Sequence, residues 1–264
     1  MHTLTRKVAR LSGHSKWATT KHRKAAQDSK RSALFSKLSR IITVAAKEGG
    51  DPNPENNSSL AAAIDKAKGY SLPKDKIESA INKAFGGGAD GAVYENVVYE
   101  GYGPAGIAVY LECLTDNRNR TAADVRSAFT HAGGNLGTTG SVAFQFERKG
   151  RIFVAKEDNA EDEDEFMMAV AEAGGDDYED DDEQWIVYTD PKELATVRKG
   201  IEDQGIAVKG AELTMVPTNT TEVSVADAKK VMRLVDRLEE LDDVQNVYHT
   251  MEMTDEIAAA LDED

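Results

Sequence analysis

The sequence lacks the features of a disulfide-linked secreted domain, a sulfur-ligated metal protein or a membrane protein. It has one cysteine, Cys113, and six prolines in 264 residues. A single cysteine excludes an internal disulfide framework and a cysteine-based zinc site, and it is consistent with a reducing compartment. No apolar run approaches the roughly 20 residues needed to cross a bilayer. A hydrophobic content of 40% is enough for packed domains, so we expect a globular protein with no membrane partner.

Acidic residues are scarce at the amino terminus and abundant elsewhere. Residues 1–50 carry 12 Lys and Arg against two acids, a net charge of +10, whereas the 20 bases and 45 acids of residues 51–264 sum to −25. Such asymmetry indicates a polyanionic partner for one end of the chain. We expect the acidic remainder, including the base-free run from Glu157 to Glu183, to repel phosphates and so to orient the molecule.

A helix with two distinct faces ends the basic segment. Apolar residues between Leu34 and Ala46 recur at the spacing that places them on one stripe of a helix. At roughly 100° per residue, four cations fall on an arc beside that stripe: Lys30, Lys37, Arg40 and Lys47. We expect the stripe to pack and the arc to contact phosphates. A merely solvated basic face is the alternative.

The residues before this helix extend the candidate nucleic-acid interface. They comprise cations and two rings: Lys16, Trp17, Lys21, His22, Arg23, Lys24 and Arg31. Trp17 beside Lys16 is able to stack on a base, and packing in a core is the open alternative. His14 and His22 have no third ligand and do not stand at a metal-binding i, i+4 spacing. We therefore predict no metal and no cofactor.

Several stretches of the chain resemble the YebC/PmpR family, which includes the mitochondrial translational activator of cytochrome oxidase. The stretches are GHSKW at 13–17, KHRKAAQDSKR at 21–31, AAKEGGDP at 45–52, LPKDKIESAINKA at 72–84, LTDNRNRT at 114–121 and HAGGNLGTTGSVAFQF at 131–146. The resemblance covers nearly the whole chain, from Ser12 to about Met253. It implies one helical domain and two α+β domains.

The pattern of the remaining residues predicts the same α+β class. Residues 1–85 are typical of a basic helical domain, and alternating strand patterns begin beyond Gly88. The strands expected near 93–100 and 107–114, with one helix, form an incomplete unit, as do the strands near 213–216 and 244–251 with their helix. Joined, the two units make a four-stranded, ferredoxin-like sheet with two helices on one face.

This combination predicts three domains, one of them inserted into another. They are a helical domain (1–85), a discontinuous α+β domain (86–132 and 211–264) and an inserted acidic α+β domain (133–210).

Two motifs were candidates for binding an anion. Arg118 and Arg120 stand at the start of an expected helix, where cations oppose the helix dipole, so an anion bound nearby would explain them. Pairing of Arg120 with Asp116 or Asp124 is the alternative, and we favour it. The glycines of residues 133–140 are not followed by the Lys-Ser/Thr of a P-loop and lead into a strand, so we interpret them as a turn-rich linker.

The sequence predicts a nucleic-acid-binding factor with no catalytic residues and no small-molecule substrate. The basic face alone does not separate RNA from DNA. The resemblance implies a ribosome-associated factor that assists elongation at stretches such as consecutive prolines, near ribosomal RNA and tRNA. The alternative is a DNA-binding transcriptional regulator, although no helix-turn-helix or zinc finger stands out. Residues 1–11 are basic but lack the hydrophobic region of a signal peptide. The resemblance implies a start close to the GHSKW motif, so we favour a bacterial extension or a misassigned start, and the bacterial cytoplasm, over a mitochondrial presequence and the mitochondrial matrix.

Overall fold

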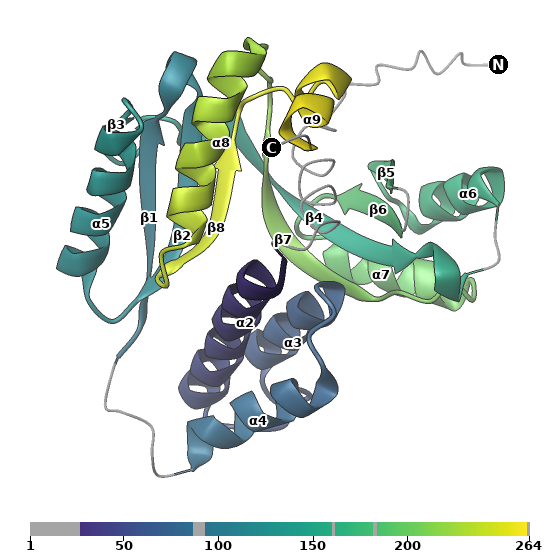
Figure 1. The fold of residues 1–264 in the computed structure, drawn as a ribbon. Coiled ribbons are helices and arrows are strands. Elements are labelled where there is room, and N and C mark those ends of the chain that lie inside the picture. The colour runs from purple at the N-terminus through teal and green to yellow at the C-terminus, as the bar shows by residue number, and fades with distance from the viewer. Residues whose placement is uncertain (1–26, 87–92, 160–161, 182–183, 263–264) are drawn as a thin grey trace.

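The structure is a computed structural model that describes residues 27–86, 93–159, 162–181 and 184–262. A helical part is followed by two four-stranded antiparallel sheets, each covered by helices (Figure 1). The predicted α+β class is confirmed. In the described ranges no helix is both long and apolar enough to cross a bilayer.

Three helices form the amino-terminal part: α2 (Gln27–Gly49), α3 (Ser58–Gly69) and α4 (Lys74–Phe85). Leu38 and Ile42 of α2 are buried against the apolar faces of α3 and α4, so the predicted stripe is confirmed. Asn57 fixes the corner between the first two helices. Its side-chain oxygen accepts from Leu60 N at 3.0 Å, and its amide donates to Ala45 O at 2.9 Å. One side chain therefore caps α3 and binds the end of α2.

The first sheet has the order β3–β1–β2–β8. Its strands are β1 (Glu95–Tyr102), β2 (Ala108–Thr115), β3 (Asn135–Leu136) and β8 (Val244–His249). Helices α5 (Arg118–His131) and α8 (Val225–Glu239) cover one face, and α9 (Asp255–Asp262) packs on α8 (Figure 1). Alternate residues of β2, such as Val109 and Leu111, point into this core because successive side chains of a strand face opposite sides. The predicted pairing of the 93–114 strands with the last strand is confirmed.

The second sheet has the order β5–β6–β4–β7. Its strands are β4 (Phe146–Ala155), β5 (Asp177–Asp181), β6 (Gln184–Thr189) and β7 (Gly210–Pro217). Helices α6 (Glu163–Ala173) and α7 (Leu194–Asp203) pack on one face, where Phe166 stacks on Trp185 with ring centroids 4.1 Å apart. Short 3-10 turns lie at η1 (Pro104–Gly106), η2 (Ala143–Gln145) and η3 (Lys156–Asp158).

The placement of the strand at 213–216 in the first sheet was wrong. That strand is part of β7, which pairs with β4 along its length. Strand β4 is continuous through Gly150. A Cβ on Gly150 would lie 2.7 Å from Thr189 Oγ1, so this glycine permits close packing rather than a turn. The fourth strand of the first sheet is β3 instead, and the boundary expected at residue 211 falls within β7.

The helical part approaches the second sheet closely where α3 meets β7. A Cβ on Gly210 would lie 2.4 Å from Asp65 O and 2.5 Å from Gly69 N. Only glycine allows this approach without displacing backbone. Arg198 of α7 adds an ion pair to Asp65 beside the contact.

A buried polar network crosses the same junction. Glu212 of β7 accepts a hydrogen bond from Arg151 of β4 and another, of 3.1 Å, from Tyr70 Oη, and it lies 3.2 Å from Lys66 Nζ on α3. Lys66 also donates to Asn246 Oδ1 of β8 at 3.0 Å. The network thus joins the helical part to both sheets, and we call it the junction network.

Candidate nucleic-acid interface

Most of the expected amino-terminal ligands lie outside the described residues. They are Lys16, Trp17, Lys21, His22, Arg23 and Lys24. Lys30 lies in the first turn of α2, but its side chain is also outside the described set. The role of these residues in binding nucleic acid stays a prediction.

Lys37 does not face solvent as the helical arc predicted. Its side chain is buried, and its ammonium donates to the backbone oxygen of Glu239 at the end of α8. Burial lowers the pKa of Lys37 to about 8, with Asp242 partly opposing that shift. The prediction that Lys37 contacts phosphates is therefore corrected: the turn between α8 and β8 covers it.

Arg40 contributes to the same contact one turn later. Its Nη1 donates to Asp242 O at 2.9 Å and lies 3.6 Å from the Asp243 carboxylate. The guanidinium also lies 5.9 Å from the centre of the Tyr94 ring. A helix end carries partial negative charge on its free carbonyls, so cations on α2 bind well there. Lys37 and Arg40, the middle residues of the predicted arc, therefore bind the helical part to the turn between α8 and β8.

The two ends of α2 remain accessible. Arg31 is exposed, with its guanidinium 5.2 Å from the centre of the Phe35 ring, and Lys47 is exposed in the last turn. Because Arg31 and Lys47 stand more than four turns apart, they do not form one patch.

Arg118 and Arg120 are both paired with carboxylates. Arg118 lies 3.6 Å from Glu95, and Arg120 donates to Asp116 at 2.8 Å and to Asp243 at 2.7 Å. Burial alone would raise the pKa of Asp243, but hydrogen bonds from Arg120 and Thr121 keep it below its ordinary value. The geometry favours pairing over an anion site at these two arginines.

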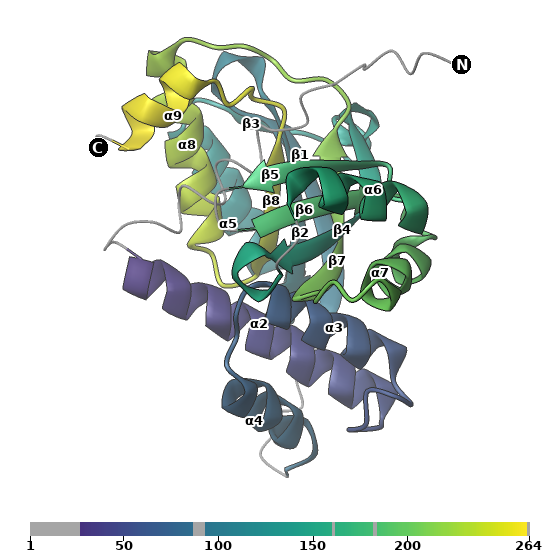
Figure 2. The same ribbon diagram turned by 90° about the vertical axis from the view of Figure 1, so that its right-hand side faces the viewer.

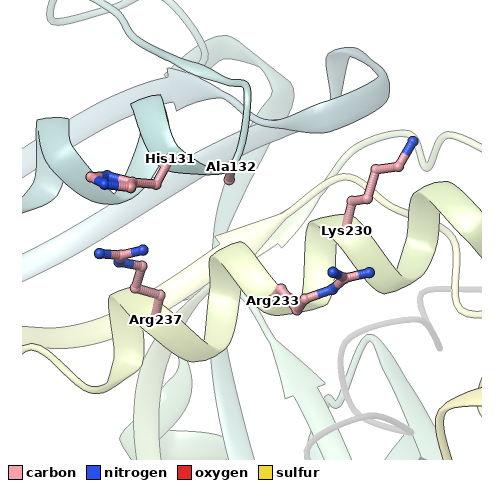
Figure 3. A pocket seen from close by; sticks show the side chains of 5 residues that line it. All are labelled: His131, Ala132, Lys230, Arg233 and Arg237. Atoms are coloured by element: carbon pink, nitrogen blue, oxygen red, sulfur yellow. The ribbon is translucent and has the colours of Figure 1, made fainter.

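A basic groove between α5 and α8 was not anticipated from the sequence. Its lining residues are His131, Ala132, Lys230, Arg233 and Arg237, around a volume of about 240 Å³. Figure 3 shows the three cations along α8 and His131 facing them from the end of α5. We call it the α5–α8 groove.

A sequence signal for this groove existed. Lys230, Arg233 and Arg237 stand at i, i+3 and i+7, which places them on one face of a helix. The net charge of this region does not show such a face, because residues 86–264 carry 15 bases against 40 acids. The partner His131 comes from a different helix and is brought near only by the fold.

Comparison with known proteins agrees with this architecture. A family model described as the TACO1/YebC protein N-terminal domain matches residues 15–87, and one described as the TACO1/YebC second and third domain matches residues 94–251. The chain belongs to the TACO1/YebC family.

Relatives in the family match over almost their whole length. The chain is similar to a "Probable transcriptional regulatory protein" of Rubrobacter xylanophilus, with 50% identity over 94% of this chain and 98% of the relative. A protein of the same description from Lactiplantibacillus plantarum is also 50% identical, over 93% of this chain and 100% of the relative. A crystal structure of a conserved hypothetical protein from Aquifex aeolicus superposes with a TM-score of 0.78 at 44% identity, covering 91% of this chain and 98% of that one.

Proposed function

We propose that this TACO1/YebC family member is a non-enzymatic, nucleic-acid-binding regulatory factor that associates with the ribosome and assists elongation at stretches such as consecutive prolines. The names of the bacterial relatives support a regulatory role on nucleic acid. The preference for ribosomal RNA and tRNA rests on the sequence resemblance and on the geometry of α2.

The packing of α2 is the observation that carries this proposal. One side of the helix is buried on α3 and α4, and Lys37 and Arg40 on another side are bound to the α8–β8 turn. A DNA recognition helix needs an exposed face whose side chains reach base edges in the major groove. Among the described side chains of the first half of α2, Arg31 is the one exposed long side chain, and the exposed Ser32, Ala33 and Ser36 are short. A factor that docks on folded RNA by charge and shape needs no such face.

Positioning is the mechanism that suits this architecture. The ribosome supplies the chemistry of peptide-bond formation, so a bound factor accelerates the reaction by orienting the reactants. The junction network binds α3 to both sheets, α2 packs on α3, and Lys37 binds α2 to the end of α8, so the start of α2 is held in place where the basic segment joins it. The net charge of −25 on residues 86–264 favours an orientation that keeps most of that region away from phosphates.

Deleting residues 13–26 tests the proposal without removing any residue of α2. We expect the shortened protein to keep the circular dichroism and thermal midpoint of its folded parts but to lose rescue of a proline-rich reporter in a reconstituted translation system. A full-length control, Lys192→Gln with Lys199→Gln, removes two exposed cations elsewhere and should rescue normally.

Two outcomes would contradict the proposal. The first is full rescue by the protein without residues 13–26. The second is in-cell crosslinking of the intact protein to a specific promoter with no crosslinks to ribosomal RNA, which would favour the DNA-binding transcriptional regulator.

A further inference from the structure

Cations are rare on the two sheets and their helices, and most are neutralised. Residues 86–264 contain 15 bases against 40 acids. Many of these bases pair with carboxylates, among them Arg118, Arg120, Lys149, Arg151, Lys156 and Arg198. A cluster of cations without counter-ions is therefore an exception on this part of the molecule.

The α5–α8 groove holds such a cluster. Lys230 pairs with Asp227 at 2.8 Å, but in the described part of the chain no carboxylate pairs with Arg233 or Arg237, and both are exposed. The Arg233 guanidinium donates a hydrogen bond to the Lys229 backbone oxygen within the same helix. The groove thus presents two unneutralised guanidinium groups on an otherwise acidic surface.

Helix stability does not explain the arrangement. The helix dipole favours Arg237 because that residue stands in the last turn, but Arg233 stands one turn earlier. Arg233 and Arg237 are like charges at i, i+4, a pairing that opposes helix formation. Figure 3 shows the two side chains extending in different directions, so an anion at each guanidinium would offset this repulsion.

His131 closes the groove on the other side. Its Nδ1 lies 2.7 Å from Ser127 O, and since a carbonyl oxygen only accepts, Nδ1 donates that hydrogen bond. This bond holds the ring in place, and Nε2 makes no hydrogen bond to the described residues. Figure 3 shows Arg237 extending towards His131 across the groove.

The size and spacing suit a strand of nucleic acid. The groove volume of about 240 Å³ is smaller than the roughly 300–1,000 Å³ of sites for drug-sized ligands, so it fits a small anionic group better than a cofactor. Lys230 and Arg237 are seven residues apart, about 10 Å along the helix axis. A strand that follows this face of the helix is therefore able to contact more than one of these side chains.

We infer that the α5–α8 groove is a second nucleic-acid contact, in which Arg233 and Arg237 bind backbone phosphates. The inference rests on the proposed nucleic-acid-binding function and adds a site to it. Guanidinium groups match phosphate geometry by donating two parallel hydrogen bonds. Such contacts position a strand and carry no sequence information.

The groove lies on the same side of the molecule as the start of α2. Lys37 contacts Glu239, which is two residues beyond Arg237, and Gln27 stands about 15 Å of helix before Lys37. Figure 2 shows the first turns of α2 and the α5–α8 pair on that shared side. One strand is therefore able to reach both the groove and the root of the basic segment.

The test uses two double variants. The groove variant carries Arg233→Gln and Arg237→Gln, and the matched control carries Lys192→Gln and Lys199→Gln. Fluorescence anisotropy measures binding of a labelled 20-nucleotide RNA and of a labelled duplex DNA across a salt series. The groove variant should weaken RNA binding and lower the salt slope by about 1.4, since each lost contact on a single strand contributes roughly 0.7. The control should keep the slope of the wild type, and circular dichroism should show both variants folded.

The outcomes separate this inference from the proposed function. If the wild type binds RNA and the groove variant keeps its slope and affinity, the inference is overturned and the proposed function stands. If the slope falls only on duplex DNA, the groove is a phosphate site of a DNA regulator, and the ribosomal proposal fails. If the wild type binds neither probe, both are overturned.

Discussion

Replacing Glu212 by Gln tests whether buried charges hold the three parts of the molecule together. Glu212 is 6% exposed, and its carboxylate is shared by Arg151 of β4, by Lys66 of α3 and by Tyr70 just after α3. Glutamine keeps the size of the side chain but carries no charge. Lys66 and Arg151 would then remain buried without their shared counter-ion.

Two independent routes give the size of the effect. Burial alone would raise the pKa of Glu212, but Lys66 and Arg151 hold it at about 2, below the ordinary 4.5. At about 1.4 kcal/mol per unit, this difference corresponds to about 3 kcal/mol of folding stability at neutral pH. Removing one partner of a buried ion pair costs about 3–5 kcal/mol. We therefore expect Glu212→Gln to lower the free energy of unfolding by about 3–5 kcal/mol.

The pH dependence follows from the direction of the shift. A carboxyl whose pKa is lowered by folding stabilises the protein above its unfolded pKa, and that contribution is lost as the pH falls through the folded value. The difference between wild type and Glu212→Gln should be full above pH 4.5 and should shrink towards pH 2.

Urea unfolding followed by circular dichroism, at pH 7 and along a descending pH series, measures this difference. Amide hydrogen exchange measures the junction separately from global unfolding. In Glu212→Gln the protection of α3 amides should fall more than that of the other helices and strands. The control is Glu202→Gln, which removes an exposed carboxylate paired with Arg198 and should cost less than about 1 kcal/mol. A loss below about 1 kcal/mol for Glu212→Gln, or a difference that persists unchanged at pH 2, would refute the reasoning.

Three further substitutions test the contacts between the parts. Lys37→Met should raise the free energy of unfolding by about 1–3 kcal/mol at pH 7, because it removes a buried charge. This difference in free energy of unfolding, measured with urea, should shrink as the pH rises from 8 to 10.5, because folded wild-type protein then carries a neutral Lys37. Gly210→Ala should cost about 1–3 kcal/mol and increase hydrogen exchange in α3, since the new methyl group would meet Asp65 O. Asp243→Asn should lower the free energy of thermal unfolding by about 1.5–3 kcal/mol by weakening the bond from Arg120, and an unchanged midpoint would contradict this.

The periodicity of apolar residues predicted which face of a helix or strand packs into a core. Leu38 and Ile42 lie where the helical spacing of α2 placed them, and alternate residues of β2 form the core under α5 and α8. The pairing of β2 with β8 was also predictable, because two strands and one helix do not make a stable sheet and each of the two units needs the other. These features depend on burial of apolar area, which the sequence displays directly.

Contacts between distant elements were beyond the same reasoning. The helical spacing predicted the side of α2 on which Lys37 lies. It did not predict the partner of Lys37, because Glu239 is 202 residues away in the sequence. Glu212 occupies a strand position that alternation would assign to solvent, and it is buried because α3 covers that part of β7. Periodicity describes the sides of one element and does not reveal which other element packs on each side.

The distinction between neutralised and unneutralised cations changes which residues define the candidate interface. Lys37, Arg40 and Arg120 all end at residues 239–243, where the carbonyls at the end of α8 and the Asp243 carboxylate attract positive charge. These three cations are therefore bound within the fold, at or beside the joint between α2 and the first sheet, and their charge is not available to a polyanion. Arg233 and Arg237 are exposed on the same helix, and no carboxylate in the described ranges pairs with either of them. If polyanion binding follows the charge that folding leaves unpaired, the surface that meets nucleic acid includes the outer face of α8 together with the segment before α2, and the middle of α2 sets the distance between them.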